Sequence, residues 1–444
     1  MISITRARTI GVVILSGILA AAAPGYAESP SLADRVIEHK LANGMTVLMV
    51  ERHQAPIVSI NMTFGVGGVN EQVGLTGLAH LYEHMAFKGT RTVGTRDYER
   101  EQAVLDELTV VGNELDHRER DEAARAQMEG KPHVASPEVQ QLQRRFKELQ
   151  EKAGEFVVGN EMALLYQRHG GVGLNASTGK DITRYVISLP ANRLPLWAAL
   201  ESDRMAHPVL REFYKERGVV MEERRLRTDD SPNGLLYETF TSTAFQAHQY
   251  GVPTIGWGSD IMALTPAATE AFFKTYYGPN NATVAIVGDI QPKEVIALIE
   301  QTFGKIPAAP PIPALVTEEP PQRGERRVEI EFDAEPALAI GYHKPTIGHP
   351  DDFVFDVIDE VLTEGVTSRL YSTLVRDKRL AASVLSDTNY PGVRAPNLFV
   401  IAATPLAPHT TAEVESAIYE ELERLKTEPI SAKEFERVLN GLDA

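Results

Sequence analysis

The sequence contains no cysteine among its 444 residues. Disulfide bonds and thiolate metal ligands are therefore excluded. The fold must be held together by packed cores, and any metal site must use histidine and carboxylate ligands, which also suit an oxidising compartment.

Positive charge is scarce, because 44 lysines and arginines face 61 aspartates and glutamates, for a formal net charge of −17. Phosphate binding requires a basic surface, so no nucleic-acid partner is expected. An acidic surface is compatible with a basic or unfolded peptide as partner. It is equally compatible with a surface that only keeps the protein in solution.

Long hydrophobic runs are absent beyond the N-terminus. There, Arg6 and Arg8 precede an apolar run from Ile10 to Ala23, and small residues follow up to Ala27. This order is typical of a secretory signal peptide over residues 1–27, and the run is short for a membrane span. An uncleaved anchor is the alternative. We expect a periplasmic or secreted protein with no membrane span after signal removal.

The length predicts more than one core. In residues 28–305 the apolar patterns and turn signals predict strands and helices. The strands are expected at Arg35–Lys40, Met45–Glu51, Ile57–Gly67, Thr183–Leu189 and Ala282–Gly288. The helices are expected at Leu75–Phe87, Leu194–Ala206 and Glu212–Arg227. A charged helical insertion at about 113–158, broken at Lys131-Pro132-His133, is typical of a solvated hairpin.

Residues 306–325 are rich in proline and predict a stiff linker. Residues 326–444 then repeat the order of the first part. Strands are expected at Arg327–Phe332, Ala337–Tyr342 and Leu398–Ala403, and helices at Phe353–Thr363, Arg369–Arg376, Thr411–Lys426 and from Ala432. No counterpart of Ala282–Gly288 follows, so this second related unit is expected to be incomplete at its C-terminus; a natural ending with few strands is the alternative.

The helix around His80 carries the chemistry. His80 and His84 are four residues apart and therefore share one face of a helix, where two imidazoles can bind one zinc ion. Glu83 also reaches that face and can take a proton from a zinc-bound water without being a ligand. This His-x-x-Glu-His order inverts the commoner zincin motif. The flanking residues are small or apolar, so the alternative, two satisfied core histidines, leaves three ionisable groups unexplained.

A catalytic zinc needs a third protein ligand. Glu201, an acid on an otherwise apolar helical stretch, is the candidate, and Asp203 is its local competitor. Spacing does not choose between them. The charged run Glu222–Arg225 is expected either to support the zinc helix from outside or to be a solvated helix face. The remaining histidines show no ligand spacing.

Several segments together resemble the pitrilysin/insulinase family of inverzincins, in particular its half-size bacterial branch, which is similar to mitochondrial processing peptidase. They are Gly77–Thr90, Gly173–Thr178, Leu200–Met205, Glu216–Arg225, Tyr250–Trp257 and Asn280–Asp289. The resemblance extends over nearly the whole chain from Ala33, apart from the charged insertion.

The resemblance implies an α+β fold of two similar units, each a mainly antiparallel sheet covered by helices, which form one half of a clamshell. It implies one zinc ion per chain, with Glu201 as third ligand. Asn175 and Ala176 match the edge segment that pairs with the substrate backbone. Backbone pairing inside a closed chamber would give sequence-tolerant binding of peptides.

One departure from the family pattern concerns the second unit, which usually carries an arginine and a tyrosine that face the substrate. Here Arg376 is present, but Ala382 replaces the tyrosine. Losing such an oxyanion donor costs roughly 10²–10³ in rate. We therefore expect a homodimer or a heterodimer in which a related subunit supplies the Arg/Tyr pair.

The sequence thus predicts a zinc-dependent endopeptidase or oligopeptidase that hydrolyses short or unfolded peptides, with Glu83 as general base. The alternative is a non-catalytic subunit that binds peptides or assembles a heteromeric peptidase. The intact set of ionisable residues argues against it. A metal-storage protein fits poorly, because a single site with a general base is suited to catalysis.

Overall fold

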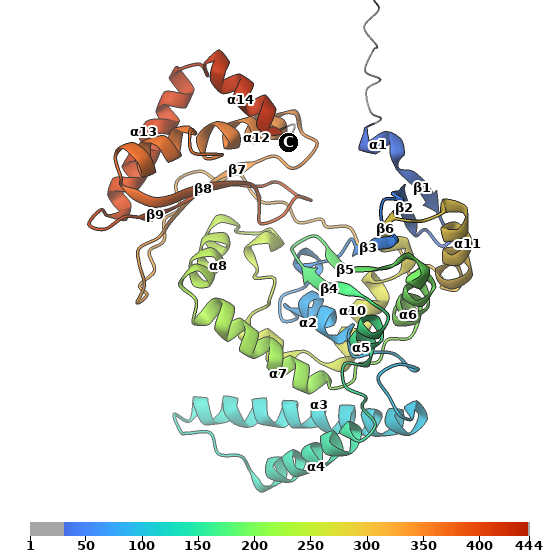
Figure 1. Cartoon of the computed structure of the whole chain (residues 1–444). Helices are drawn as coiled ribbons and strands as arrows, with labels where there is room; N and C mark the ends of the chain where they lie inside the picture. The colour runs from blue at the N-terminus through green and yellow to red at the C-terminus, as the bar shows by residue number, and fades with distance from the viewer. Residues whose placement is uncertain (1–30, 443–444) are drawn as a thin grey trace, which may run out of the picture. The chain divides into compact units, whose positions relative to one another are not determined.

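A computed structural model describes residues 31–442, so the predicted signal peptide lies outside the described residues. The chain divides into a short N-terminal part ending at Val36, with the helix α1 (Leu32–Arg35), and a compact unit that begins at Ile37. No helix in the described range is both long and apolar enough to cross a membrane. The fold is α+β, with helices packed on sheets (Figure 1).

The first sheet has six strands in the order β1-β2-β6-β3-β5-β4. They are β1 (Ile37–Lys40), β2 (Thr46–Glu51), β3 (Ile57–Phe64), β4 (Val172–Thr178), β5 (Thr183–Pro190) and β6 (Ala282–Gly288). All neighbours are antiparallel except β2 and β6. Residues of β3, β5 and β6 alternate between buried and less buried positions, as expected for a sheet with one face in the core. This sheet leaves β4 at one edge.

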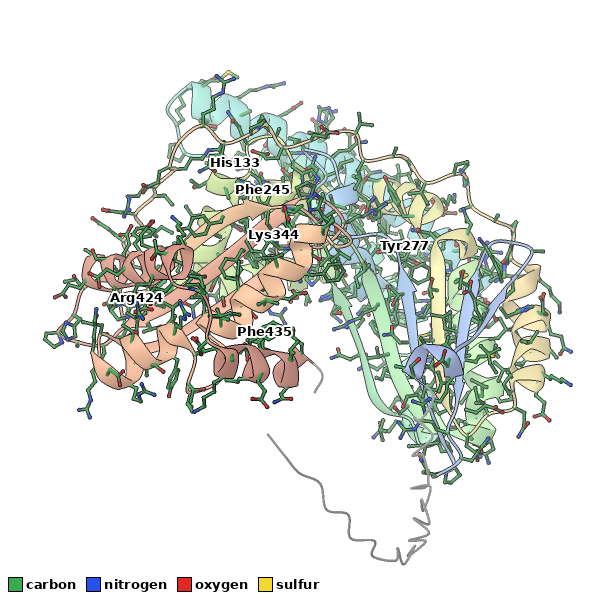
Figure 2. The ribbon with its side chains drawn as sticks, turned by 90° about the horizontal axis from the view of Figure 1, so that it is seen from above. His133, Phe245, Tyr277, Lys344, Arg424 and Phe435 are labelled. Atoms are coloured by element: carbon green, nitrogen blue, oxygen red, sulfur yellow. The ribbon has the colours of Figure 1, made fainter. Side chains whose placement is uncertain are left out.

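One apolar core joins this sheet to its helices. Those helices are α2 (Leu78–Met85), α5 (Glu161–Arg168), α6 (Leu194–Ala206), α10 (Pro266–Tyr276) and α11 (Pro292–Thr302). Tyr277, which follows α10 and is marked in Figure 2, stacks among Phe64, Tyr82 and Phe273 with ring centroids 4.3 to 6.2 Å apart. The predicted strands and helices of residues 28–305 are confirmed, with ends that shift by a few residues.

The charged insertion forms the predicted helical hairpin. Its helices are α3 (Tyr98–Met128) and α4 (Pro137–Gly154), and the break falls at Pro132. The two helices lie side by side in Figure 1. A small apolar cluster with Leu108 and Leu149 joins them. Arg217 in α7 (Phe213–Arg224) holds Asp116 of α3 through two hydrogen bonds of 2.6 and 3.0 Å. A π-helical turn, Arg225–Asp229, and the helices α8 (Pro232–Ala244) and α9 (Gly258–Ala263) follow α7.

The proline-rich segment contains no helix or strand, and neither does the stretch after it up to Ala337. The prediction of a strand at Arg327–Phe332 is therefore wrong. A strand requires a neighbour for its backbone hydrogen bonds, and this segment has none. Its arginine instead pairs through the side chain, with Arg327 contacting Glu415.

The second sheet has three strands in the order β7-β9-β8. They are β7 (Leu338–Lys344), β8 (Ala381–Tyr390) and β9 (Asn397–Pro405), and the helices are α12 (Pro350–Leu362), α13 (Thr411–Thr427) and α14 (Ala432–Leu442). The strand β8 was not predicted, because polar residues interrupt its apolar pattern. Where an α-helix was predicted at Arg369–Arg376, the structure has a π-helical segment, Tyr371–Asp377.

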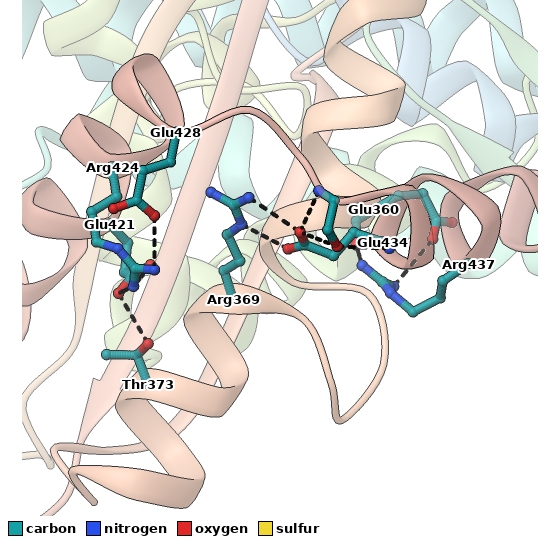
Figure 3. Close-up of polar contacts among 9 residues, drawn as sticks. Glu360, Arg369, Thr373, Glu421, Arg424, Glu428, Glu434 and Arg437 are labelled. Atoms are coloured by element: carbon teal, nitrogen blue, oxygen red, sulfur yellow. Dashed lines mark hydrogen bonds and ion pairs between the residues drawn. The ribbon is translucent and has the colours of Figure 1, made fainter.

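Ion pairs connect the helices of this second part. Lys344 at the end of β7, labelled in Figure 2, is buried and pairs with Asp352 in the first turn of α12. Arg369 binds Glu434 of α14 at 2.9 Å, and Arg437 donates to the backbone carbonyl of Glu360 in α12 at 2.7 Å (Figure 3). These contacts fix α14 against α12.

The first prediction concerns the buried guanidinium of Arg211. It binds Glu101 at 2.6 Å and donates to the carbonyls of Lys88, Thr90 and Val93, just after the helix that carries the histidines. Arg211→Ala leaves the buried Glu101 carboxylate uncompensated, so we expect a loss of about 3–5 kcal/mol of unfolding free energy. Urea unfolding followed by circular dichroism measures it. Arg118→Ala, which breaks an exposed pair with Glu114, should cause no measurable loss, and an equal loss in both variants would contradict the assignment.

The second prediction concerns Asp359 in α12, whose pKa is raised to about 6, mainly by burial. The folded state therefore holds this proton more tightly than the unfolded state, and stability falls as pH rises from about 4 to 6. Asp359→Asn should raise the unfolding free energy at pH 7 by about 1 kcal/mol, a value reduced because the side chain is only half-buried, and should change nothing at pH 4. Thermal melts at both pH values test this, and a gain of the same size at pH 4 would refute it.

Candidate metal centre

The helix α2 is fixed by a cap at its N-terminus. The carboxylate of Glu71 accepts hydrogen bonds of 2.8 Å from the backbone amides of Gly77 and Ala79, which the first helical turn leaves unpaired. Gly77 has a φ of 90°, and a Cβ there would lie 2.6 Å from the carbonyl oxygen of Ile255. A residue without a side chain is therefore required at the point where the chain enters this helix.

The two predicted histidines lie on the face of α2 that turns away from the core. Leu78, Leu81 and Met85 are buried on the opposite face. The side chains of His80 and His84 are 12% and 22% exposed, and their ring centroids are 4.9 Å apart. The helical spacing thus places both imidazoles side by side, as the sequence predicts.

The carboxylate that meets both rings belongs to Glu223 of α7. Its oxygens lie 3.6 Å from Nε2 of His80 and 3.3 Å from Nε2 of His84. In the described part of the chain, these three residues are the group whose ligand atoms lie close enough together, within 4.8 Å, to hold a metal ion. Two imidazole nitrogens and one carboxylate match the three-ligand set of catalytic zinc sites, so the residues fit the ion.

A second carboxylate on α7 orients His84. Oε2 of Glu216 lies 3.3 Å from Nδ1 of His84, and its other oxygen binds Lys88 at 2.5 Å. A histidine ligand commonly donates its second nitrogen to such a carboxylate, which fixes the tautomer and the ring plane. Glu216 therefore supports the centre from outside the ligand group. The run Glu222–Arg225, expected either to support the zinc helix or to be a solvated face, instead contributes Glu223 to the ligand group.

The two histidines differ electrostatically. Hydrogen bonds that the His84 ring donates to Glu216 and Glu223 raise the pKa of His84 to about 9, whereas burial lowers the pKa of His80 to about 4. Burial raises the pKa of the Glu83 carboxyl from its usual value. Oε2 of Glu83 accepts a hydrogen bond of 2.6 Å from the hydroxyl of Thr178, at the end of β4. Glu83 is outside the ligand group and is thus available for proton transfer.

Glu201 does not join the histidines, and the expectation that it is the third ligand is corrected here. It is buried in α6, where it pairs with Arg204 and accepts a hydrogen bond of 2.6 Å from Tyr166. Both oxygens are engaged in this contact set, which explains an acid on an apolar helix. Its competitor Asp203 accepts hydrogen bonds from Thr90 and Thr92. Glu223 takes the expected place of Glu201.

A signal for Glu223 was present in the sequence. It follows Glu216 by seven residues, which is two helical turns, so both carboxylates lie on one face of α7. The same spacing rule identified the histidines. What the spacing alone could not show was that this face of α7 packs opposite α2.

Among the described residues, the predicted substrate-binding residues form no hydrogen bond or ion pair with the metal-ligand group. Asn175 and Ala176 lie in β4, the edge strand whose outer side has no neighbour among the described strands. Thr178 of the same strand contacts Glu83, so this edge ends at the candidate centre. Arg376 is exposed and pairs with its neighbour Asp377 at 2.7 Å. It makes no hydrogen bond or ion pair with His80, His84 or Glu83 within residues 31–442.

The chain resembles known proteins both in sequence and in fold. Residues 46–106 match the profile described as insulinase (peptidase family M16), and residues 263–442 match the one described as the peptidase M16 inactive domain. The chain is 30% identical to the zinc protease PqqE of Helicobacter pylori over 406 residues, which cover 90% of this chain and 76% of that protein.

Solved structures give the same result for the fold. A protease from Helicobacter pylori superposes with a TM-score of 0.73 at 28% identity, over 92% of this chain and 84% of the other. Pitrilysin superposes with a TM-score of 0.59 at 17% identity, over 92% of this chain and 38% of its own. The extent of the sequence identity shows that the chain belongs to the M16 (pitrilysin/insulinase) family of zinc proteases.

Proposed function

We propose that the chain is a zinc-dependent endopeptidase or oligopeptidase that hydrolyses short or unfolded peptides. The observation that carries this proposal is the convergence of His80, His84 and Glu223 beside Glu83, a carboxylate outside the ligand group. A peptide-binding subunit without catalysis would not need a poised carboxylate at the metal ligands. The family membership supports the same chemistry.

Each residue of the candidate centre has a distinct role in the proposed hydrolysis. His80, His84 and Glu223 would hold one zinc ion, which when bound activates a water and polarises the scissile carbonyl. Glu83 takes the proton of the attacking water and passes it to the leaving amine, a role favoured by its raised pKa. Thr178 keeps the Glu83 carboxylate in place, and Glu216 holds the ring of His84.

The edge strand β4 supplies a way to bind the substrate. An extended peptide that pairs with the outer backbone groups near Asn175 and Ala176 would continue to Thr178 and hence to Glu83. Such pairing uses main-chain hydrogen bonds and is tolerant of sequence. A partly folded or short peptide would satisfy this requirement.

The organisation of the whole protein is part of the proposal. We propose a zinc-bearing unit over residues 28–305, a linker at 306–325 and a second related unit from 326, which together form one half of a clamshell. Because Arg376 is engaged with Asp377 and Ala382 has no hydroxyl, a homodimer or a related subunit would supply the Arg/Tyr pair. Export through residues 1–27 would place the protein in the periplasm or outside the cell.

The third prediction tests the general base. Glu83→Gln keeps the size of the side chain but cannot accept a proton, so kcat on a quenched fluorescent peptide should fall by about 10²–10⁴-fold. Bound zinc, counted by atomic emission, should stay at one ion per chain. Each protein is assayed alone and with candidate partner subunits. Full activity of Glu83→Gln, or no zinc in the unmodified chain, would refute the proposed function.

The fourth prediction separates the two candidate ligands. Glu223→Gln should weaken zinc affinity by at least about 10–100-fold, because a charged ligand is lost, while the fold persists. Glu201→Gln should retain zinc but lower the unfolding free energy by about 3 kcal/mol, because Arg204 is left buried and unpaired. Competition with a chromophoric chelator measures the affinities. The reverse pattern would restore Glu201 as the ligand.

A further inference from the structure

A cavity of about 650 Å³ shares one lining residue, Arg227, with the contacts of the candidate centre. It lies between the segment that follows α7, the helix α8 and the strand β8. Its lining includes Leu226, Arg227, Tyr237, Leu385, Asp387 and Tyr390, together with the polar Ser231 and Asn233. Leu226 and Leu385 are 59% and 52% exposed, so two large apolar side chains face this space without a covering partner within residues 31–442.

Arg227 connects the cavity to the metal-ligand group. Its guanidinium binds Oε1 of Glu223 at 2.7 Å, and that same oxygen faces His80. From the ligand group, one chain of contacts runs through Glu83 and Thr178 to β4, and a second runs through Arg227 to the cavity. A peptide paired with β4, with its scissile bond at the ligands, would therefore bring a nearby side chain to the cavity.

The two charged side chains that line the cavity differ in their ion pairing. Arg227 pairs with Glu223 of the ligand group, whereas Asp387 forms no ion pair with any described residue and accepts one hydrogen bond of 2.8 Å, from the amide of Asn389. A β-bulge lies between Asp387 and Tyr390, where the register with β9 shifts. Bulges redirect side chains, and this one lies where β8 lines the cavity.

Two aromatic rings complete the arrangement. Tyr237 and Tyr390 have ring centroids 5.5 Å apart, inclined by 53°. Both tyrosines line the cavity together with Asp387. Burial raises the pKa of both hydroxyls, and the negative charge of Asp387 raises it further. Aromatic faces attract cations, and an uncompensated carboxylate does so more strongly.

We propose that this cavity is a substrate subsite that takes the side chain of a lysine or arginine close to the scissile bond. The stem of such a side chain would pack on Leu226 and Leu385, and its cationic end would lie between the two tyrosines and Asp387. This inference rests on the proposed peptidase function, which it deepens by naming the preferred substrate class.

The test uses quenched fluorescent peptides that differ at one position, occupied by arginine, leucine or glutamate, with the position moved along the peptide. For at least one position, the full chain should cleave the arginine peptide about 10-fold better in kcat/KM than the leucine peptide, as one cation–carboxylate–aromatic contact predicts. Asp387→Asn should remove that preference and leave cleavage of the leucine peptide unchanged within about twofold. Asp387→Arg should favour the glutamate peptide.

Asp351→Asn serves as the matched control, because it removes an exposed carboxylate at the start of α12, outside the cavity. It should leave the arginine preference intact. Equal effects of Asp387→Asn on the arginine and leucine peptides, or no preference in the unmodified chain, would overturn the subsite while leaving the peptidase function standing.

A binding measurement without cleavage tests the subsite independently of the proposed peptidase function. Fluorescence anisotropy of the same labelled peptides on the Glu83→Gln protein should show about 10-fold tighter binding of the arginine peptide, lost when Asp387→Asn is added. This result would support the subsite even if no peptide were hydrolysed, in which case only the proposed function fails. Equal affinity for arginine and leucine peptides would reject the subsite.

Discussion

The contact between the imidazoles of α2 and the carboxylates of α7 is the interaction on which the candidate centre depends. Glu223 meets both histidines and Glu216 meets the outer nitrogen of His84. These groups are only partly exposed, so an unpaired charge among them would be costly. The helix α2 therefore supplies the imidazoles and α7 supplies the carboxylates. The relative placement of the two helices fixes the geometry for a metal ion.

The surroundings hold both helices in that placement. Glu71 caps α2 at the point where Gly77 lets the chain pass close to Ile255, and the buried Arg211 ties the segment after α2 to Glu101 of α3. The same hairpin contacts α7 through Asp116 and Arg217. The charged hairpin, although mostly solvated, is thus tied to α7 by an ion pair and, through Arg211, to the segment that follows α2.

The second sheet is connected to the first part by a compact polar contact. Asp181, in the turn between β4 and β5, accepts hydrogen bonds from Tyr250 at 2.9 Å and from the amide of Val393 at 2.7 Å. The hydroxyl of Tyr250 also accepts from the amides of Arg394 and Ala395. The loop between β8 and β9 is therefore fixed to the end of the strand pair that carries Thr178. This contact helps to explain why β8 lines a cavity next to the ligand group.

The sequence by itself determined the local features of this protein. Apolar periodicity located most strands and helices, the proline-rich segment marked a stretch without regular structure, and the His-x-x-Glu-His spacing placed His80, Glu83 and His84 on one helix face. These features depend on neighbours a few residues apart, whose geometry is set by the period of the helix or strand. The same period places Glu216 and Glu223 on one face of α7.

Only the tertiary structure decided which distant carboxylate faces the histidines. Glu201 and Glu223 are both acids on helices far along the chain, and nothing local distinguishes a buried ion pair with Arg204 from a position opposite α2. The failure of Arg327–Phe332 to form a strand has the same origin, because a strand exists only where a neighbour accepts its hydrogen bonds. Contacts between residues separated by a hundred or more positions are fixed by the packing of whole elements, and local spacing carries no information about that packing.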